Sequence, residues 1–378
     1  MKLLLTCGGT GGHISPALSV AELWKQKGGD VLIAGNFEEV GRDLIDSEEY
    51  RIRSIPAAPL PRRLSIRLLK SLGVNLTGMW RARKIIKKFE PHVVLGTGGY
   101  ASGAVVLTAS LLGYPAAIHE QNSYPGLANR LLARHSDLIA ISYSESKKYF
   151  KDKFRKRIEH TGNPIRQSIT EVDRHEARDK LNIPQSNFAV RVMGGSQGAA
   201  VINKALISAY EKLTSLDDFY AIHITGKNNY EYMIEKAGKN LSSSARRKIE
   251  FISFCDEMEY PLAAADLFVG RAGATTLAEI TASSLPAILI PYPHAAADHQ
   301  LQNARVLSEC GAASLLEESS LSPGSIEDEI SYLYHNEKLL QQMSLHSGEL
   351  GFPRAAENIV RLLQNLAEGE ESYGDIRN

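Results

Sequence analysis

The chain has 378 residues, of which 43% are hydrophobic and 23% are charged. This composition is typical of globular proteins rather than disordered or fibrous ones, and the length suits two α/β domains better than a single core. Its 43 Lys and Arg residues balance 43 Asp and Glu residues. The net charge therefore gives no reason to expect nucleic acid as a partner.

The sequence predicts neither a disulfide framework nor a membrane span. Cys7, Cys255 and Cys310 are odd in number and widely spaced, which indicates a reducing compartment rather than disulfides or a zinc site. Glycines interrupt the apolar N-terminal run, so it predicts a first strand rather than a signal peptide. The longest uncharged run, 101–118, contains Ser, Thr, Gly and Pro and predicts a helix, a turn and a strand.

Short runs rich in Val, Ile and Leu alternate with longer helical patterns, which indicates parallel sheets and crossover helices, the α/β class. In the first half these runs predict strands at 2–7, 30–34, 51–55, 93–96, 116–119 and 138–141. In the second half they predict strands at 188–193, 221–225, 250–254, 267–269 and 287–290.

A turn at 161–164 and the charged segment 171–180 predict a domain boundary near residue 163. We therefore expect one domain over 1–162 and another over 163–350. A final helix and an acidic tail fill 351–378, and the tail carries little apolar content.

Three glycine-rich loops follow predicted strands, at 8–13, 96–103 and 194–198. Such loops expose backbone N–H groups at the carboxyl ends of strands, where open α/β sheets bind ligands. Each loop could also be an ordinary tight turn. The first loop lacks the dinucleotide pattern, because Ile14 occupies its third glycine position counted from Gly9, and no Walker-type phosphate loop occurs.

The second half contains two segments that suit a nucleotide sugar. In the segment 271–279 a helix start follows a predicted strand, so its N–H groups can face an anion while Glu279 accepts from a diol such as a ribose. In the segment 291–303, Gln300 and Asn303 share one helical face. Taken singly, each residue could be ordinary helix surface.

The motifs GGTGGHISPA, GTGGYASG, HEQNSYPGLAN, TGNPIR, GGSQGA, RAGATTLAEI and DHQLQNA occur in this order between residues 8 and 304. By these motifs the chain resembles the MurG family, the lipid-linked N-acetylglucosaminyltransferases of bacterial peptidoglycan synthesis. The resemblance implies a GT-B fold, with two Rossmann-like domains facing a cleft. The second domain would hold UDP-N-acetylglucosamine (UDP-GlcNAc), and the first would hold the acceptor lipid I, undecaprenyl-pyrophosphoryl-MurNAc-pentapeptide.

The resemblance also assigns binding roles by motif. The uridine would lie near Cys255 and Arg271, although the family more often has an aliphatic residue at the position of Cys255. Glu279 would bind the ribose, and Gln300 with Asn303 would bind the sugar. The remaining binding candidates are Thr10, Gly11, Gly12, Asn122, Arg166, Ser196, Gln197, Ala274, Thr275 and Thr276.

Transfer with inversion needs a base for the acceptor hydroxyl and stabilisation of the departing diphosphate. His13 is the candidate base, because neutral imidazole titrates near the working pH; alternatively it only orients its loop. Helix N-termini and Arg166 would stabilise the diphosphate. No D-x-D carboxylate pair occurs, so we expect neither a metal ion nor another cofactor.

The stretch 51–88 contains eleven Lys or Arg residues, no Asp or Glu, and interleaved apolar residues that include Leu60, Leu64 and Trp80. Beside a lipid substrate this pattern predicts docking on an anionic membrane, and so a peripheral protein on the cytoplasmic side of the bacterial inner membrane. The alternative is an ordinary helix with its apolar stripe turned inward.

Other functions share some of these features. A GT-B enzyme with another acceptor, or a UDP-sugar epimerase, would have the same glycine loops and ribose carboxylate. A nucleotide-sugar-binding module would bind without turnover, and a Rossmann oxidoreductase would need a nicotinamide. The HEQN segment and the basic stretch favour the lipid acceptor.

Overall fold

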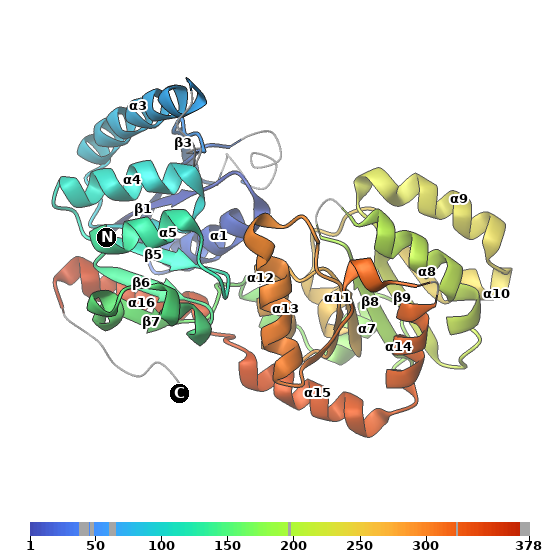
Figure 1. Cartoon of the computed structure of the whole chain (residues 1–378). Coiled ribbons are helices and arrows are strands. Elements are labelled where there is room, and N and C mark those ends of the chain that lie inside the picture. The colour runs from blue at the N-terminus through green and yellow to red at the C-terminus, as the bar shows by residue number, and fades with distance from the viewer. Residues whose placement is uncertain (38–44, 46–48, 60–65, 196–197, 323, 371–378) are drawn as a thin grey trace. The chain divides into compact units, whose positions relative to one another are not determined.

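The computed structural model describes residues 1–37, 45, 49–59, 66–195, 198–322 and 324–370. It divides into two compact units (Figure 1). The first comprises Met1–Arg166 together with Arg354–Asn378, and the second comprises Gln167–Pro353.

The first unit is built on a seven-stranded parallel sheet in the order β3-β2-β1-β4-β5-β6-β7. Both faces of its central strands are buried, which explains their nearly continuous apolar sequences. The strands are β1 (Lys2–Cys7), β2 (Asp30–Gly35), β3 (Arg51–Ser54), β4 (Val93–Gly96), β5 (Ala116–Glu120), β6 (Leu138–Ile141) and β7 (Ile158–His160).

Helices cover both faces of this sheet. Alternate residues of β1 point to opposite sides, so that Leu3 and Leu5 join one apolar cluster and Leu4 joins the other. The first cluster is completed by α1 (Gly11–Gln26) and α16 (Ala355–Glu368), and the second by α3 (Ile66–Phe89), α4 (Gly99–Leu111) and α5 (Leu127–Leu132).

The second unit has a six-stranded sheet in the order β10-β9-β8-β11-β12-β13, with parallel pairing throughout. Its strands are β8 (Phe188–Met193), β9 (Phe219–Ile224), β10 (Ile249–Ile252), β11 (Leu267–Gly270), β12 (Ala287–Leu289) and β13 (Ala313–Leu315).

The helices of the second unit are α6 (Ser168–Glu171), α7 (Arg174–Lys180), α8 (Ala200–Leu213), α9 (Tyr230–Asn240), α10 (Ser243–Arg246), α11 (Glu259–Ala263), α12 (Ala274–Ala282), α13 (His299–Glu309), α14 (Ser325–Tyr334) and α15 (Glu337–Leu350). Short 3₁₀ turns occur in both units, at η1 (Ala133–His135), η2 (Ser144–Tyr149), η3 (Asp152–Arg157), η4 (Lys227–Asn229), η5 (Ala296–Asp298) and η6 (Glu318–Ser320).

The predicted strands are present, with ends that differ by at most two residues. The sequence analysis missed β7 and β13, which are edge strands of three residues each and too short to show a pattern. It also assigned the final helix and acidic tail, 351–378, to neither domain, whereas Arg354–Asn378 groups with the first unit. Figure 1 shows α16, in red, among the blue and green elements of that unit.

The strand order creates a topological switch point in each sheet, where successive connections run in opposite directions. In the first unit it lies between β1 and β4, and in the second between β8 and β11. Open α/β sheets bind ligands outside the carboxyl ends of the strands at such points. The three glycine-rich loops follow β1, β4 and β8, so the fold places all of them at these two positions.

Replacing Leu363, which is fully buried between α16 and the first sheet, tests whether α16 is part of the first unit. We expect Leu363→Ala to lower the free energy of unfolding by about 2–5 kcal/mol, since the lost side chain leaves a cavity. Urea unfolding followed by circular dichroism measures this change. The matched control is Leu111→Ala at the exposed end of α4, which should cost about 0.5 kcal/mol or less; equal losses would contradict the assignment.

Candidate functional site

The first glycine loop is shorter than the sequence suggested. The sequence analysis gave a loop over 8–13, but α1 begins at Gly11, with Thr10 as its N-cap residue. Gly11, Gly12 and His13 therefore form the first turn of a helix rather than a loop. The backbone N–H of His13 bonds to the Thr10 carbonyl at 3.0 Å, and the first N–H groups of α1 point out of the helix end, where an anion or a hydroxyl can accept from them.

The loops after β1 and β4 approach each other so closely that neither leaves room for side chains. A Cβ on Gly99 would lie 2.5 Å from the Cα of Gly8, and a Cβ on Gly98 would lie 2.6 Å from Nδ1 of His13. Gly98 and Gly99 also have positive φ angles of 111° and 82°, which other residues rarely adopt. Glycine at these positions lets the His13 ring lie directly against the second loop.

A chain of hydrogen bonds holds the His13 ring. Nδ1 of His13 lies 3.1 Å from Oε1 of Gln121. The Gln121 amide nitrogen donates to the Thr97 carbonyl at 2.7 Å and to Nδ1 of His119 at 2.9 Å. The other ring nitrogen of His119, Nε2, donates to the Gly162 carbonyl at 3.1 Å. Because the amide nitrogen is committed to acceptors, Gln121 presents its oxygen to His13.

This network selects one form of His13. A neutral imidazole that donates from Nδ1 carries its basic lone pair on Nε2. Burial lowers the pKa of His119 to about 4, although its bond to the Gly162 carbonyl opposes the shift. His119 thus stays neutral at ordinary pH and keeps its donor and acceptor nitrogens fixed. The sequence analysis quoted the HEQN motif without assigning roles to His119 or Gln121; only their three-dimensional contacts reveal them.

A buried carboxylate shapes the segment that carries Asn122. Glu120 is 2% exposed and accepts from the backbone and side-chain nitrogens of Asn122 at 3.0 and 3.2 Å. It also accepts from the backbone of Gly126 at 2.9 Å and from the Asn129 amide at 2.8 Å. Glu120, which we did not predict, therefore positions a predicted binding residue. Arg166, a predicted binding residue, is half-buried and ends the segment Met1–Arg166 of the first unit.

In the second unit, α12 starts directly beyond β11 at the switch point. Ala274, Thr275 and Thr276 form its first turn, so their N–H groups lie at the helix N-terminus as predicted. The buried hydroxyl of Thr275 has no hydrogen-bond partner. Glu279 lies on the same helix and is only 8% exposed.

Arg271 joins two segments at this edge of the sheet. Its Nη1 donates to the carbonyls of Ile290 and Pro291 at 3.0 and 3.1 Å, and its Nη2 forms an ion pair with Glu318 at 2.5 Å. The side chain is 8% exposed. Arg271 therefore ties the loop after β11 to the chain after β12, a structural role that the sequence did not suggest.

The remaining predicted residues lie on neighbouring connections. Gln300 accepts from the Tyr292 backbone at 2.9 Å, whereas Asn303 is fully buried within the unit. Cys255 is half-buried after β10, and burial raises the pKa of its thiol. Ser196 and Gln197 lie outside the described residues. Among the described residues, no group of three or more His, Cys, Asp or Glu side chains is arranged to hold a metal ion.

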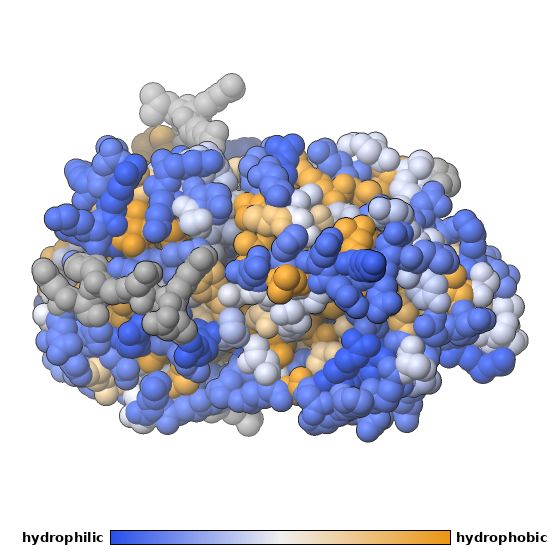
Figure 2. Space-filling view, turned by 90° about the horizontal axis from the view of Figure 1, so that it is seen from below, coloured by the Kyte–Doolittle hydropathy of each residue, from blue (hydrophilic) through white to orange (hydrophobic). Residues whose placement is uncertain are grey.

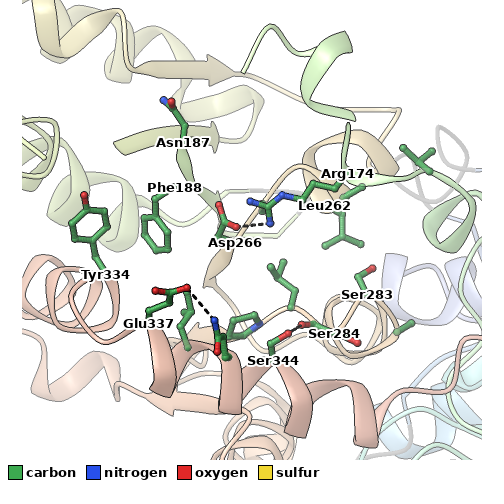
Figure 3. Close-up of a pocket in the computed structure, with 18 of the residues that line it drawn as sticks. Arg174, Asn187, Phe188, Leu262, Asp266, Ser283, Ser284, Tyr334, Glu337 and Ser344 are labelled. Carbon is green, nitrogen blue, oxygen red and sulfur yellow. Dashed lines mark hydrogen bonds and ion pairs between the residues drawn. The ribbon is translucent and has the colours of Figure 1, made fainter. Parts of the chain in front are cut away.

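A cavity of about 980 Å³ lies at the opposite, amino edge of the second sheet (Figure 3). Phe188, Tyr334, Glu337 and Ser344 line it, and Figure 3 shows Asp266 turned toward Arg174. Asp266 forms ion pairs with Arg174 at 2.5 Å and with the fully buried Arg178 at 2.7 Å. None of the predicted binding residues lines this cavity, so the candidate site is at the carboxyl edge.

Two parallel-sheet Rossmann-like units, each with glycine loops or helix starts at its switch point, define the α/β GT-B class of glycosyltransferases. Models of the glycosyltransferase family 28 N-terminal and C-terminal domains match residues 3–141 and 189–359. A relative from Halothermothrix orenii is 43% identical, over 98% of this chain and 100% of its own length. It is named UDP-N-acetylglucosamine--N-acetylmuramyl-(pentapeptide) pyrophosphoryl-undecaprenol N-acetylglucosamine transferase. This chain belongs to that family of glycosyltransferases.

Solved structures agree with this fold. The crystal structure of Acinetobacter baumannii MurG matches with a TM-score of 0.74 and 27% identity, over 97% of this chain and 100% of the other. A putative UDP-N-acetylglucosamine 2-epimerase from Listeria monocytogenes matches with a TM-score of 0.71 at 14% identity, over 100% of this chain and 99% of the other. The similarity to the epimerase, at this low identity, shows only a shared fold.

Buried neutral His119 should make stability depend on pH. Its folded pKa of about 4 is below the ordinary value of 6.5, so the unfolded chain takes up the proton first as pH falls. This contribution is complete above about pH 6.5 and is lost toward pH 4, by up to about 3 kcal/mol. Urea unfolding between pH 7 and 4.5 should show a shallower loss for His119→Gln than for the wild type. The exposed His92→Gln control should keep the wild-type slope, and identical slopes for all three proteins would refute the assignment.

Proposed function

We propose that this chain transfers N-acetylglucosamine from UDP-GlcNAc to the C4 hydroxyl of the MurNAc residue of lipid I, with inversion, to give lipid II for peptidoglycan synthesis. Full-length similarity to transferases named for these substrates supports the reaction. The observation that carries the mechanism is the contact between Nδ1 of His13 and Oε1 of Gln121, whose amide nitrogen donates to the Thr97 carbonyl.

On the acceptor side, Nε2 of His13 removes the proton from the C4 hydroxyl as its oxygen attacks the anomeric carbon. The new C–O bond forms while the bond from the anomeric carbon to the UDP oxygen breaks, and UDP leaves with the electron pair. Gln121 holds the ring, and a positive charge that develops on His13 is stabilised by the Oε1 acceptor at 3.1 Å. Thr10, Gly11 and Gly12 offer the nearby helix start to the acceptor.

On the donor side, the α12 N-terminus with Ala274, Thr275 and Thr276 holds the diphosphate, together with Ser196 and Gln197. The unpartnered Thr275 hydroxyl supports this role, because an anionic oxygen would supply the acceptor it lacks. Glu279 binds the ribose diol, and Cys255 with Arg271 lies near the uracil. Gln300 and Asn303 define the sugar subsite. The Asn303 side chain is buried, and its role is to orient the side chains around it.

Incorporation of labelled N-acetylglucosamine from UDP-GlcNAc into a lipid I analogue tests this mechanism. We expect transfer by the wild type to persist with EDTA, and kcat of His13→Ala to fall about 10²–10⁴-fold, since the base is lost. The KM for UDP-GlcNAc should change little, because His13 belongs to the acceptor side.

The exposed His335→Ala variant is the control for this assay and should retain wild-type turnover. Wild-type transfer that EDTA abolishes would contradict the metal-free mechanism, and full activity of His13→Ala would remove His13 as the base. Absence of transfer by the wild type would argue against lipid I as the acceptor.

We also infer that α3 docks this enzyme peripherally on an anionic membrane, on the cytoplasmic side where the three free cysteines stay reduced. Leu69, Leu72, Leu76 and Trp80 are 70%, 42%, 65% and 57% exposed, and their spacing places them on one face of α3. The alternative reading of the sequence was a helix whose apolar stripe packs inward. In the structure a different set of apolar residues on α3, which includes Ala82 and Ile86, packs into the core. Leu60 and Leu64 of the basic stretch lie outside the described residues.

Basic side chains accompany the exposed stripe. Lys84 lies over the Trp80 ring at 3.5 Å, and Arg81, Lys87 and Lys88 are exposed on the same helix. Apolar side chains can enter the interface while the cations meet anionic headgroups. By comparison, the face drawn in Figure 2 is largely hydrophilic, with apolar residues only in scattered patches. In the described part of the chain, no helix is both long and apolar enough to cross a bilayer.

Sedimentation with vesicles tests the docking face. We expect Leu69→Ser/Leu76→Ser to bind phosphatidylglycerol vesicles at least about tenfold more weakly than the wild type, because two apolar side chains no longer enter the interface. Leu345→Ser, at an equally exposed leucine on α15, is the control. Binding should weaken in high salt and on phosphatidylcholine, and unchanged binding of the double variant would exclude this face.

A further inference from the structure

Three buried polar side chains form a chain of hydrogen bonds between α8 and β9 of the second unit. Tyr210 and Asn203 lie on α8 and His223 lies on β9, and none of the three is more than 1% exposed. The Tyr210 hydroxyl lies 2.8 Å from Nδ1 of His223, and Nε2 of His223 lies 3.0 Å from Oδ1 of Asn203. The Asn203 amide nitrogen donates to the Thr225 carbonyl at 3.0 Å. The chain thus ends on a backbone carbonyl directly after β9.

The Thr225 carbonyl sets the direction of every bond in this chain. A carbonyl oxygen only accepts, so the Asn203 amide turns its nitrogen toward Thr225 and its oxygen toward His223. Nε2 of His223 therefore carries the proton and donates to that oxygen, and Nδ1 accepts from the Tyr210 hydroxyl. Burial lowers the pKa of His223 to about 3, so the ring is neutral at ordinary pH and can both donate and accept.

The same carbonyl contacts the third glycine-rich loop, 194–198. A Cβ on Gly198 would lie 2.2 Å from the Thr225 oxygen and 3.1 Å from the Cα of Gly226. Gly198 has a positive φ of 75°, which other residues rarely adopt, and it lies two residues before the start of α8. Asn203, in the second turn of α8, therefore binds the carbonyl against which the end of the loop packs.

The two contacts hold the loop and the helix to one point of the sheet. Gly198 fixes the distance between the end of the loop and the chain after β9. The bond from Asn203 fixes the position of α8 against the same carbonyl. A fully satisfied buried network has one favourable arrangement, whereas apolar contacts would allow the helix to slide. The start of α8 is thus held in place by directed bonds.

We propose that Asn203 and His223 are positioning residues for the diphosphate of the nucleotide sugar, because their directed hydrogen bonds hold the start of α8 and the end of the third glycine-rich loop against the Thr225 carbonyl. They act through the backbone rather than by contact with the donor. This proposal rests on the proposed function, which assigns the diphosphate to this loop and to the start of α12.

Nitrogen-15 NMR of the histidine rings tests the direction of the chain. We expect His223 to be the Nε2-protonated neutral tautomer, since Nδ1 accepts from Tyr210. The spectrum of His223→Gln, which lacks these signals, assigns them. A proton on Nδ1 instead would reverse the chain and overturn the proposal.

Binding of UDP and of uridine, measured by ligand-observed NMR, tests the effect on the donor side. Asn203→Asp is nearly isosteric, but an oxygen replaces the nitrogen that donates to the Thr225 carbonyl. We expect this variant to bind UDP about tenfold more weakly, the value of one hydrogen bond. Uridine lacks the diphosphate, so its affinity should change less than about twofold. In the transfer assay, the loss should appear in the KM for UDP-GlcNAc more than in kcat.

Two variants of His223 separate the hydrogen bonds from the volume of the ring. His223→Leu removes both ring nitrogens and should weaken UDP binding about as much as Asn203→Asp. His223→Gln can still donate to the Asn203 oxygen and should stay within about threefold of the wild type. If Asn203→Asp does not fold, this pair of variants carries the test, and thermal unfolding monitors folding throughout.

The matched control is Ser347→Ala. It removes an equally buried hydrogen bond of the second unit, from the Ser347 hydroxyl to the Leu285 carbonyl at 3.0 Å. We expect this variant to lower thermal stability and to leave UDP affinity unchanged.

Three binding results would overturn the proposal. These are unchanged UDP affinity in Asn203→Asp and His223→Leu, equal weakening of UDP and uridine, and a loss of UDP affinity in Ser347→Ala as large as theirs. A wild type that binds neither UDP nor UDP-GlcNAc would instead overturn the proposed function itself.

Discussion

The near-contact of two backbone segments at the first switch point constrains the candidate site of the first unit, the side that we propose binds the acceptor. Gly8 and Gly99 meet without room for a Cβ, and the His13 ring lies against Gly98. Any larger residue there would separate the loops after β1 and β4 and move the first turn of α1. The glycines therefore do more than expose N–H groups to a ligand: they bring a helix-borne imidazole within reach of Gln121 on the chain after β5.

Buried polar groups then determine how each unit presents its residues. In the first unit, Gln121 and His119 fix the His13 tautomer, and Glu120 shapes the segment of Asn122. In the second, the nearly buried Arg271 donates to the carbonyls of Ile290 and Pro291. Burial makes each of these groups costly unless it is satisfied. A site built this way is held in one geometry before substrate arrives, which reduces the ordering that binding and catalysis require.

The same chain combines this rigid interior with an exposed apolar stripe on α3. Apolar residues on a solvent-facing helix side are unfavourable in water, and here they accompany a stretch of basic residues without acidic ones. The helix has a second, inward set of apolar residues that anchors it to the sheet. One helix can thus belong to the core of its unit and still carry the exposed face that we propose docks on a membrane.

The sequence by itself determined the α/β class, most strands, the glycine loops and the family, because buried parallel strands and tight turns leave local patterns that need no knowledge of distant contacts. Only the tertiary structure decided that α1 starts at Gly11, that α16 returns to the first sheet, and that the short edge strands β7 and β13 form. It also decided the contacts of Gln121 and Arg271. Each of these depends on residues far apart in the chain, and local periodicity carries no information about which distant groups a side chain will meet.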